Sequence, residues 1–572
     1  MRLERYLEDL ASNVFLERLG LRAPAMLRAT QDSQHGDYQL NGLLPLSKQL
    51  NKPARELGTD LLSALTALPP VQSATIAGPG FINLTLAPAW IAAELSKQLA
   101  EPQMCLSPTP TRRRIVVDYS APNIAKQMHV GHLRSTILGA ALVKLLRAVG
   151  HEVISDNHIG DWGTQFGLLL AGLKQFGSAD ALAEQPVAEL ERIYKQANDL
   201  AKTDEAFAQA ARAELAKLQN GDPENRTVWK RLVDISRDEL QALYSTLDVS
   251  FDHWLGESAY HDRLAPLVQL LLERGIAVED QGAVCVFFSE PPELAKNKTP
   301  LIVKKSDGAF LYATTDIATV QYRLEEFGAE LCLYVVDSRQ RLHFQQVAAV
   351  TAKLGLGVEL KVVDFGSVLG MDGKPLKTRD GGTITLSALL QEAESRAMAS
   401  IHEEGLEVAE SELSMVAKAV GIGAVKYADL RQNRLSDYQF DWDKMISFRG
   451  NAGPYLQYAH ARVRAMFRKG ELDFEAFSAS EVTLQHPSEL ALGKQLLRWD
   501  EIIHMAAESY QPHLLCDHLY AVARHFSNFY QECPVLKADE PDRTSRLALA
   551  KLCALQLRAG LEFLGIQALE RM

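Results

Sequence analysis

Two histidines three positions apart, His129 and His132, stand with Gly131 where the pattern predicts that an extended segment turns into a helix. The first backbone N–H groups of a helix have no partner within it, and the helix dipole places positive charge there, so the position favours an anion. Imidazole rings can donate hydrogen bonds to phosphate oxygens, and a glycine lets a flat ring approach the backbone closely. The pattern predicts a phosphate site, and the alternative is that the histidines only cap the helix.

A glycine-rich basic loop runs from residue 370 to 383 and contains Lys374, Lys377 and Arg379. A mobile basic loop of this kind could close over a polyphosphate. The same composition also suits a solvated surface turn. Taken with the histidines, the loop strengthens the prediction of a polyphosphate site.

Several common sites are disfavoured by what the sequence lacks. It has no G-x-x-x-x-G-K-[ST] motif, and no G-x-G-x-x-G joins the first predicted strand to its helix, which argues against P-loop and dinucleotide-dependent oxidoreductase chemistry. The histidine pair lacks the intervening glutamate and the third nearby ligand of a zinc site, so we expect no bound metal. The six cysteines form no C-x-x-C pair, which favours a reducing compartment over a disulfide framework.

The elements that must position these residues form two predicted strand–helix–strand units. Residues 115–119 and 151–156 have strand character and flank a helix whose apolar residues fall on one face from 133 to 149. Residues 331–336 and 360–365 flank a second predicted helix over 340–354. Strands that alternate with helices predict a parallel sheet. Because a long insertion, roughly 180–300, separates the units, we expect a split Rossmann-like domain.

The two ends of the chain differ from this middle. Residues 1–100 open with helical periodicity and end in a Gly-Pro-Gly turn before an alternating strand, which predicts a small α+β domain. Beyond about residue 410 the pattern is helical to the end. The 572 residues carry a net charge of −12, which argues against a small basic nucleic-acid-binding module but not against a large enzyme. With no signal peptide and no apolar span, we expect a soluble, cytoplasmic protein.

Longer strings around these motifs resemble the arginyl-tRNA synthetases, a family of class I aminoacyl-tRNA synthetases. The histidine motif and the basic loop are similar to the His-x-Gly-His and Lys-Met-Ser-Lys-Ser signatures of that class. Longer segments of this chain also resemble the family pattern, namely residues 118–126, 129–136, 160–167 and 312–318, and at the two ends residues 36–39 and 453–462. The resemblance therefore runs from the N-terminal region to the C-terminal region, in the right order.

The resemblance implies that ATP activates L-arginine, which is then transferred to the terminal adenosine of arginine tRNA. ATP is expected to arrive with Mg²⁺, without a tightly bound protein metal. Catalysis would rest on positioning and on cations around the transferred phosphate rather than on a protein nucleophile. The implied catalytic residues are Lys126, His129, His132, Lys377 and Arg379. The implied ATP-binding residues are Pro122, Asn123, Lys126, His129, Gly131, His132, Lys377 and Arg379.

A guanidinium requires carboxylates in fork geometry. By resemblance, Asp118 and Asp316 face the arginine side chain with Tyr312 beside them, and two polar residues lie around the amino acid, Asn123 and Gln340. Without the resemblance, Asp118 would suit a cap at a strand end and Tyr312 a core aromatic.

The predicted tRNA contacts lie near the C-terminal end. Tyr455, Tyr458 and Arg462 combine aromatic rings with a cation, which suits stacking on unpaired anticodon bases. The same spacing on a helix also suits a core. By resemblance, the N-terminal domain contacts the elbow of the tRNA.

The basic loop departs from the class signature, because Thr378 stands where the second lysine is expected. In the family a lysine just before the histidine motif takes its place, and Lys126 has that position. The alternatives are a class I synthetase for another amino acid, a non-catalytic RNA-binding paralogue and a nucleotidylyltransferase that uses no tRNA. The pair Asp118 and Asp316 argues against the first, the retained histidines against the second, and the two flanking domains against the third.

We therefore expect an α/β fold with four regions: an N-terminal tRNA-contact domain over 1–110, a Rossmann-like catalytic domain over 111–390, a helical connecting region over 391–450 and an all-α anticodon-binding domain over 451–572. By resemblance the protein is a monomer that activates arginine only when tRNA is bound.

Overall fold

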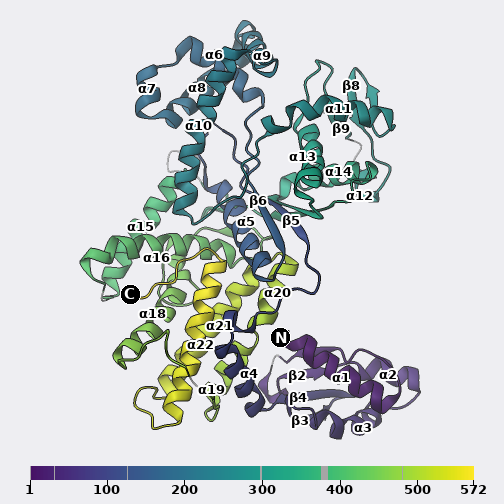
Figure 1. Cartoon of the computed structure of the whole chain (residues 1–572), viewed down its shortest axis with the longest axis vertical. Coiled ribbons are helices and arrows are strands. Elements are labelled where there is room, and N and C mark those ends of the chain that lie inside the picture. The colour runs from purple at the N-terminus through teal and green to yellow at the C-terminus, as the bar shows by residue number, and fades with distance from the viewer. Residues whose placement is uncertain are drawn as a thin grey trace.

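The computed structural model describes residues 2–572 except 31, 125, 297–298, 375, 377–383, 407 and 479–480. At its centre lies a four-stranded parallel sheet in the order β11-β10-β5-β6 (Figure 1). The strands are β5 (Arg114–Asp118), β6 (Glu152–Asp156), β10 (Leu331–Asp337) and β11 (Glu359–Phe365). Ile115, Val116 and Val117 of β5 are almost completely buried. Such a run of apolar residues is typical of a parallel strand that is covered on both faces.

Each half of the sheet has the predicted strand–helix–strand order. Helix α5 (Val130–Ala148) joins β5 to β6, and α14 (Arg341–Lys353) joins β10 to β11. The prediction of a Rossmann-like parallel sheet is confirmed. Helix α5 is buried on most sides because it contacts the sheet and also α16 (Glu410–Leu430), α20 (Trp499–Ser509) and α22 (Asp542–Phe563).

Two inserted regions separate the halves and lie beyond one end of the parallel sheet (Figure 1). The first is helical and consists of α6 (Thr164–Phe176), α7 (Ala179–Glu184), α8 (Pro186–Thr203), α9 (Glu205–Gln219) and α10 (Pro223–Thr246). The second contains α11 (His261–Glu273), α12 (Pro292–Lys296), α13 (Tyr312–Phe327) and a small antiparallel sheet of β7 (Val278–Asp280), β8 (Ala283–Val286) and β9 (Leu301–Lys304).

The N-terminal domain is α+β, as predicted. Its antiparallel sheet has the order β1-β2-β4-β3, with β1 (Leu27–Ala29), β2 (Tyr38–Leu40), β3 (Val71–Ala77) and β4 (Phe81–Leu86). The Gly-Pro-Gly turn joins β3 to β4. The helices are α1 (Leu3–Leu19), α2 (Leu43–Leu50), α3 (Ala54–Thr66) and α4 (Pro88–Ala100). An ion pair of 2.5 Å between Asp37 and Lys494 ties this domain to the C-terminal helices.

The C-terminal part is helical, as predicted, apart from one short two-stranded bridge, β12 (Val368–Leu369) with β13 (Tyr438–Gln439). The remaining helices are α15 (Leu386–Glu403), α17 (Trp442–Met445), α18 (Gly453–Lys469), α19 (Pro487–Leu497) and α21 (His513–Glu532). Within the described chain, no helix is both long and apolar enough to cross a membrane. All six cysteines are free.

Candidate active site

The candidate residues gather at the carboxyl ends of the parallel strands. Strands β5, β6 and β10 end at Asp118, Asp156 and Asp337, and the connections that follow carry the histidine motif and Gln340. Strands β5 and β10 are neighbours, but their connections lead away in opposite directions along the sheet. In open parallel sheets, ligands bind beyond the carboxyl ends at such a switch point.

The two histidines cap the N-terminus of α5 in a reciprocal arrangement. His129 Nδ1 accepts a hydrogen bond of 3.0 Å from the Gly131 N–H, and His132 Nδ1 accepts one of 3.1 Å from the His129 N–H. An imidazole nitrogen that accepts carries no proton, so in the neutral ring the proton lies on Nε2. Both histidines therefore cap the helix, and each ring keeps an Nε2–H donor, so a phosphate-binding role stays a prediction.

Both rings are neutral near pH 7. Burial, together with the neighbouring His129 and Lys126, lowers the pKa of His132 to about 4. Burial also lowers the pKa of His129, again with a contribution from Lys126. The ring centroids are 3.9 Å apart. The pair can donate from Nε2 without losing or gaining charge.

The histidines open on to a cavity of about 660 Å³ between the α5 terminus and α8. Asn123, Lys126 and both histidines line one side, and Arg192 and Lys195 of α8 line the other. Lys126 Nζ lies 4.5 Å from the centre of the Tyr194 ring, a cation–π contact. The structure thus brings together four of the predicted ATP-binding residues. Gly131 lies between the histidines, and Pro122 is buried and accepts a hydrogen bond from Gly160 N–H.

Asp118 is held from inside the domain. Its Oδ2 accepts a hydrogen bond of 2.6 Å from Arg323 Nη2, and the same nitrogen donates to Asp156 Oδ2 at 2.8 Å. Asp118 is only 5% exposed. Burial raises its pKa, and Arg323 is the main group that opposes the rise. The carboxylate therefore neutralises an internal guanidinium, and a direct contact with substrate stays a prediction.

The second predicted carboxylate belongs to a cluster at the start of α13 and α14. Asp316 Oδ2 lies 2.5 Å from His343 Nε2, and the rings of His343 and Tyr312 pack edge to face with centroids 4.8 Å apart. Tyr312 is 62% exposed. Gln340 caps α14 one turn before His343 and is exposed. Asp316 and Tyr312 thus contact the same histidine, and Gln340 precedes it at the start of α14.

Comparison with known proteins decides the family. The model of the class I (R) tRNA synthetase catalytic domain matches residues 94–442, the model of the arginyl tRNA synthetase N-terminal domain matches 3–86, and that of the DALR anticodon-binding domain matches 456–572. The arginine–tRNA ligase of Hahella chejuensis is 45% identical over 556 residues, 96% of either chain. That of Hamiltonella defensa is 46% identical over 554 residues, again 96% of each. This chain belongs to the arginyl-tRNA synthetase family.

The fold agrees with solved structures of the family. The Plasmodium falciparum arginyl-tRNA synthetase matches with a TM-score of 0.85 at 26% identity, over 100% of this chain and 99% of that one. The Thermus thermophilus enzyme matches with a TM-score of 0.82 at 25% identity, over 100% of both. The chain is therefore a ligase of the class I aminoacyl-tRNA synthetases.

In this arginyl-tRNA synthetase, backbone hydrogen bonds fix the segments on both sides of the basic loop over residues 370–383. On its N-terminal side β12 pairs with β13, and Gly370 N–H bonds to the Lys374 carbonyl. On its C-terminal side the Val130 N–H donates to the Ile384 carbonyl at 3.2 Å, against the histidine motif. The predicted residues Lys377 and Arg379 lie outside the described residues.

Three site residues were not found from the sequence. Arg323 and His343 each hold a predicted carboxylate, as described above. The third, Glu257, begins the short helix η3 (Glu257–Tyr260). Burial raises its pKa, His158 lowers it, and the carboxylates of Asp161 and Asp316 raise it, so Glu257 belongs to the same acidic region. The family resemblance covers these positions, but their residue types alone carry no signal.

The predicted tRNA contacts of this synthetase lie on α18 and are half-buried. Tyr455 packs edge to face on Tyr520 with centroids 5.9 Å apart, and the Arg462 guanidinium lies 4.4 Å from the Tyr530 ring centre. The core and RNA-stacking interpretations both fit these contacts, so their role stays a prediction.

Proposed function

We propose that this enzyme activates L-arginine with ATP and transfers the arginyl group to arginine tRNA. The observation that carries the proposal is the pair of outward Nε2–H donors on His129 and His132. They open on to a cavity shared with Lys126 and lie beside strand ends that carry acids. Family membership supplies the amino acid and the tRNA.

ATP binds at the α5 terminus. Its phosphate oxygens accept from the histidine Nε2–H groups at the positive end of the helix dipole, and Lys126 supplies a positive charge. Pro122, Asn123 and Gly131 shape the turn, and the signature loop contributes Lys377 and Arg379. Mg²⁺ enters with ATP and is held by phosphate oxygens and water. The described residues contain no cluster of metal-ligating side chains that could hold it independently.

Arginine binds on the acidic side of the same strand ends. Asp118 and Asp316 face the guanidinium with Tyr312 beside it, and Glu257 adds negative charge nearby. Asn123 and Gln340 hold the amino-acid end. Arginine carries two cationic groups, so an acidic site favours it over anionic or neutral amino acids.

The first step needs no protein nucleophile. An oxygen of the arginine carboxylate attacks the α-phosphorus, a new P–O bond forms, and the bond to the β-phosphate oxygen breaks to release pyrophosphate. Neutral imidazole donors stabilise charge on the transferred phosphate without a proton transfer. A hydroxyl of the terminal adenosine then attacks the carbonyl carbon, and AMP leaves.

The flanking domains hold the tRNA. Tyr455, Tyr458 and Arg462 face anticodon bases, the N-terminal domain contacts the elbow, and activation requires bound tRNA. The domain limits are those expected from the sequence: 1–110, 111–390, 391–450 and 451–572. The enzyme acts as a cytoplasmic monomer, and its six free cysteines support a reducing compartment.

The test is exchange of labelled pyrophosphate into ATP by the full chain, with arginine, lysine or glutamate, and with or without arginine tRNA. We expect exchange with arginine when tRNA is present. Absence of exchange under every condition would reject the enzyme, and exchange with lysine or glutamate would reject the substrate. Size-exclusion chromatography with light scattering tests the monomer.

A further inference from the structure

One arginine side chain is completely buried beneath the proposed arginine site. Arg323 lies on α13 and is 0% exposed. Its Nη2 donates to Asp118 Oδ2 and to Asp156 Oδ2, at 2.6 and 2.8 Å. These aspartates are register partners that end β5 and β6. A single guanidinium therefore links the carboxyl ends of two adjacent strands.

Stability alone is a weak reason for this arrangement. A buried ion pair gains little over apolar residues of the same volume, because the desolvation of the charges offsets their attraction. The cost is larger here, because Nε and Nη1 of Arg323 are buried without an oxygen or nitrogen partner among the described residues, and only the weakly accepting sulfur of Cys332 lies beside the guanidinium. The Tyr334 ring centre, 5.5 Å from the guanidinium carbon, offsets part of it. Buried charges retained at such a cost are typical of functional sites.

The two aspartates differ in their access to the site. The Asp156 side chain is 0% exposed, whereas that of Asp118 is 8% exposed. Arg323 contacts Oδ2 of Asp118, so Oδ1 is the oxygen available to a ligand. Asp118 is therefore the residue through which Arg323 can affect a bound molecule.

We propose that Arg323 is a positioning residue for arginine binding, which keeps Asp118 ionised and fixes the direction of its Oδ1. This inference rests on the proposed role of Asp118 in binding the substrate. Arg323 itself is too deeply buried to touch arginine. A cationic substrate group requires an acceptor that is both charged and oriented, and Arg323 provides both conditions.

The electrostatics of the triad support this role. Burial raises the pKa of Asp118, Arg323 lowers it most among the neighbouring groups, and Asp156 raises it. Without Arg323, the burial and the Asp156 charge would act together and Asp118 would take up a proton more easily. The other ionisable groups around this pair are His158 after β6, Tyr260 in η3, and Cys332 and Tyr334 in β10.

A lysine cannot replace Arg323 fully. The planar guanidinium reaches two carboxylates from one nitrogen and lies against the Tyr334 ring, whereas a lysine ammonium is a compact, strongly hydrated charge. Arg323→Lys therefore retains a charge near Asp118 but loses the geometry, and Arg323→Met loses both.

The test measures charging of arginine tRNA by the full chain from pH 6.5 to 8.5, with KM determined separately for arginine and ATP. In Arg323→Met we expect the KM for arginine to rise about tenfold at the acid end of this range, because a protonated Asp118 no longer attracts the cation, and to fall again as the pH rises. The KM for ATP should stay within about twofold. In Arg323→Lys the rise should be about threefold. Equal rises in both KM values, or a pH-independent rise, would overturn the proposal.

A double-mutant cycle with Asp118→Asn separates this inference from the function on which it rests. If Arg323 acts through Asp118, the double variant has the arginine KM of Asp118→Asn alone. Additive losses would contradict the positioning role. An unchanged arginine KM in Asp118→Asn would instead refute the proposed role of Asp118.

Asp156→Asn is the matched control, because it removes the charge of Asp156 but keeps the ion pair between Arg323 and Asp118. We expect its arginine KM to change by less than about twofold, since Asp118 keeps its partner. A loss as large as that of Arg323→Met would show that the triad acts only as a structural unit. If thermal unfolding shows that Arg323→Met does not fold, Arg323→Lys and Asp156→Asn decide, and an unchanged arginine KM in Arg323→Lys rejects the proposal.

Discussion

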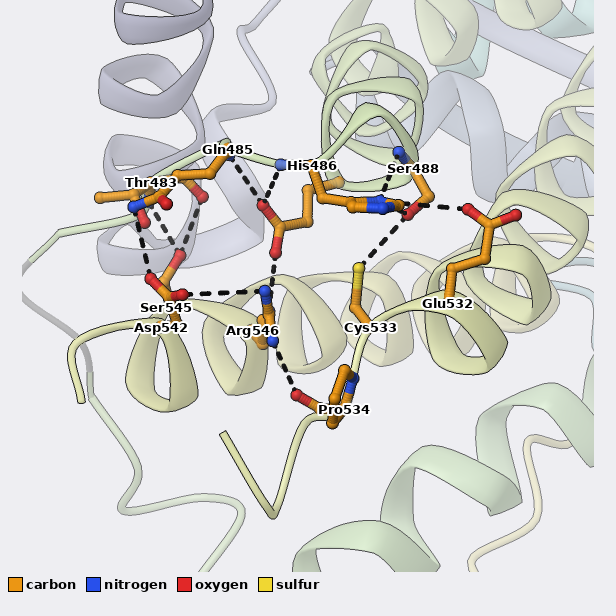
Figure 2. Close-up of polar contacts among 11 residues, drawn as sticks. Thr483, Gln485, His486, Ser488, Glu532, Cys533, Pro534, Asp542, Ser545 and Arg546 are labelled. Carbon is orange, nitrogen blue, oxygen red and sulfur yellow. Dashed lines mark hydrogen bonds and ion pairs between the residues drawn. The ribbon is translucent and has the colours of Figure 1, made fainter. Parts of the chain in front are cut away.

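Helices α5 and α19 begin with the same local device but lie in different environments. At α5, His129 is the N-cap and His132 closes the box; at α19, His486 is the N-cap and Glu489 closes it. His486 Nδ1 accepts from the Ser488 N–H at 3.3 Å (Figure 2). Glu489 Oε2 accepts from the His486 N–H at 2.9 Å. The capping box alone therefore does not indicate a ligand site.

What differs is the charge at the third helical position. Glu489 is 3% exposed and its Oε1 accepts from Arg546 Nε at 2.7 Å. Burial raises the pKa of Glu489, but the hydrogen bonds from the His486 N–H and from Arg546 lower it by more. The net pKa therefore lies below its usual range. Ser488 Oγ bridges His486 Nδ1 and Cys533 Sγ. The positive end of the α19 dipole is thus balanced within the protein.

Helix α5 has no carboxylate in its first turn. Neutral imidazoles close its capping box, and their remaining donors face a cavity with Lys126. The positive end of this dipole is left for an external anion. We therefore expect a helix terminus to suit a phosphate when its cap is satisfied but its charge is not balanced within the protein.

Changing His132 to glutamate makes α5 resemble α19 and should have the largest effect. Glutamate can still close the capping box, but a unit charge about 4 Å from a phosphate costs about 4 kcal/mol at an effective dielectric constant near 20. We expect tRNA-dependent pyrophosphate exchange to fall about 10³-fold, with no loss of thermal stability. Exchange within tenfold of the native enzyme would refute the assignment of the α5 terminus to phosphate.

Removing one donor while keeping the cap should have a smaller effect. Asparagine is a good N-cap, so His129→Asn preserves the start of α5 but deletes the Nε2–H group. We expect kcat for exchange to fall about 10²-fold, as for the loss of one donor to a developing charge. The exposed His402→Asn on α15 is the control and should match the native enzyme. If His129→Asn is as active as this control, the histidine serves only as a cap.

At α19 the expected effect is on stability and not on chemistry. Glu489→Gln keeps an acceptor for the backbone but leaves Arg546 with only the more distant Asp542 carboxylate, 3.8 Å away. Because both side chains are largely buried, we expect the free energy of unfolding to fall by about 2 kcal/mol, with unchanged pyrophosphate exchange. Thermal unfolding and amide exchange in α19 measure the loss, and the exposed Glu481→Gln is the control. A loss of exchange activity without a loss of stability would place α19 in the active site.

Much of the fold could be predicted because its signals are local. The apolar runs of β5 and β10 and the one-sided periodicity of α5 indicate strand–helix–strand units without knowledge of distant residues. The site is harder, because its geometry depends on contacts between distant segments. Arg323 lies 205 positions from Asp118, and His343 lies 27 from Asp316. Neither residue differs in its sequence pattern from a cation on a solvated helix.

The histidine motif shows how the local and distant information combine. The sequence predicts an anion site or a cap at His129 and His132, and the structure has caps. The cavity beside the two histidines exists because α8 forms its other wall. The sequence of this inserted helix indicates only an amphipathic surface. The roles of Asn123 and Gln340 stay predictions for the same reason, because a bound substrate is needed to orient them.

The smallest expected effect is a difference in how the α5 and α19 caps lose stability as the pH falls. The imidazole of His132 has a pKa near its ordinary 6.5 in the unfolded chain and of about 4 in the folded one. As the pH falls below 6.5 the unfolded chain binds the proton first, so stability is lost between pH 6.5 and 4. At pH 5.5 the expected loss is about 1 kcal/mol.

The pKa of Glu489 is instead lowered from its usual value of about 4.5, so its contribution to stability persists until lower pH. At pH 5.5 the protection from amide exchange, relative to the intrinsic rate, should therefore fall in the first turn of α5 but not in that of α19, and His132→Asn should abolish the difference. Equal loss of protection in both helices would contradict the view that α5 is capped by neutral rings and α19 by a charged pair.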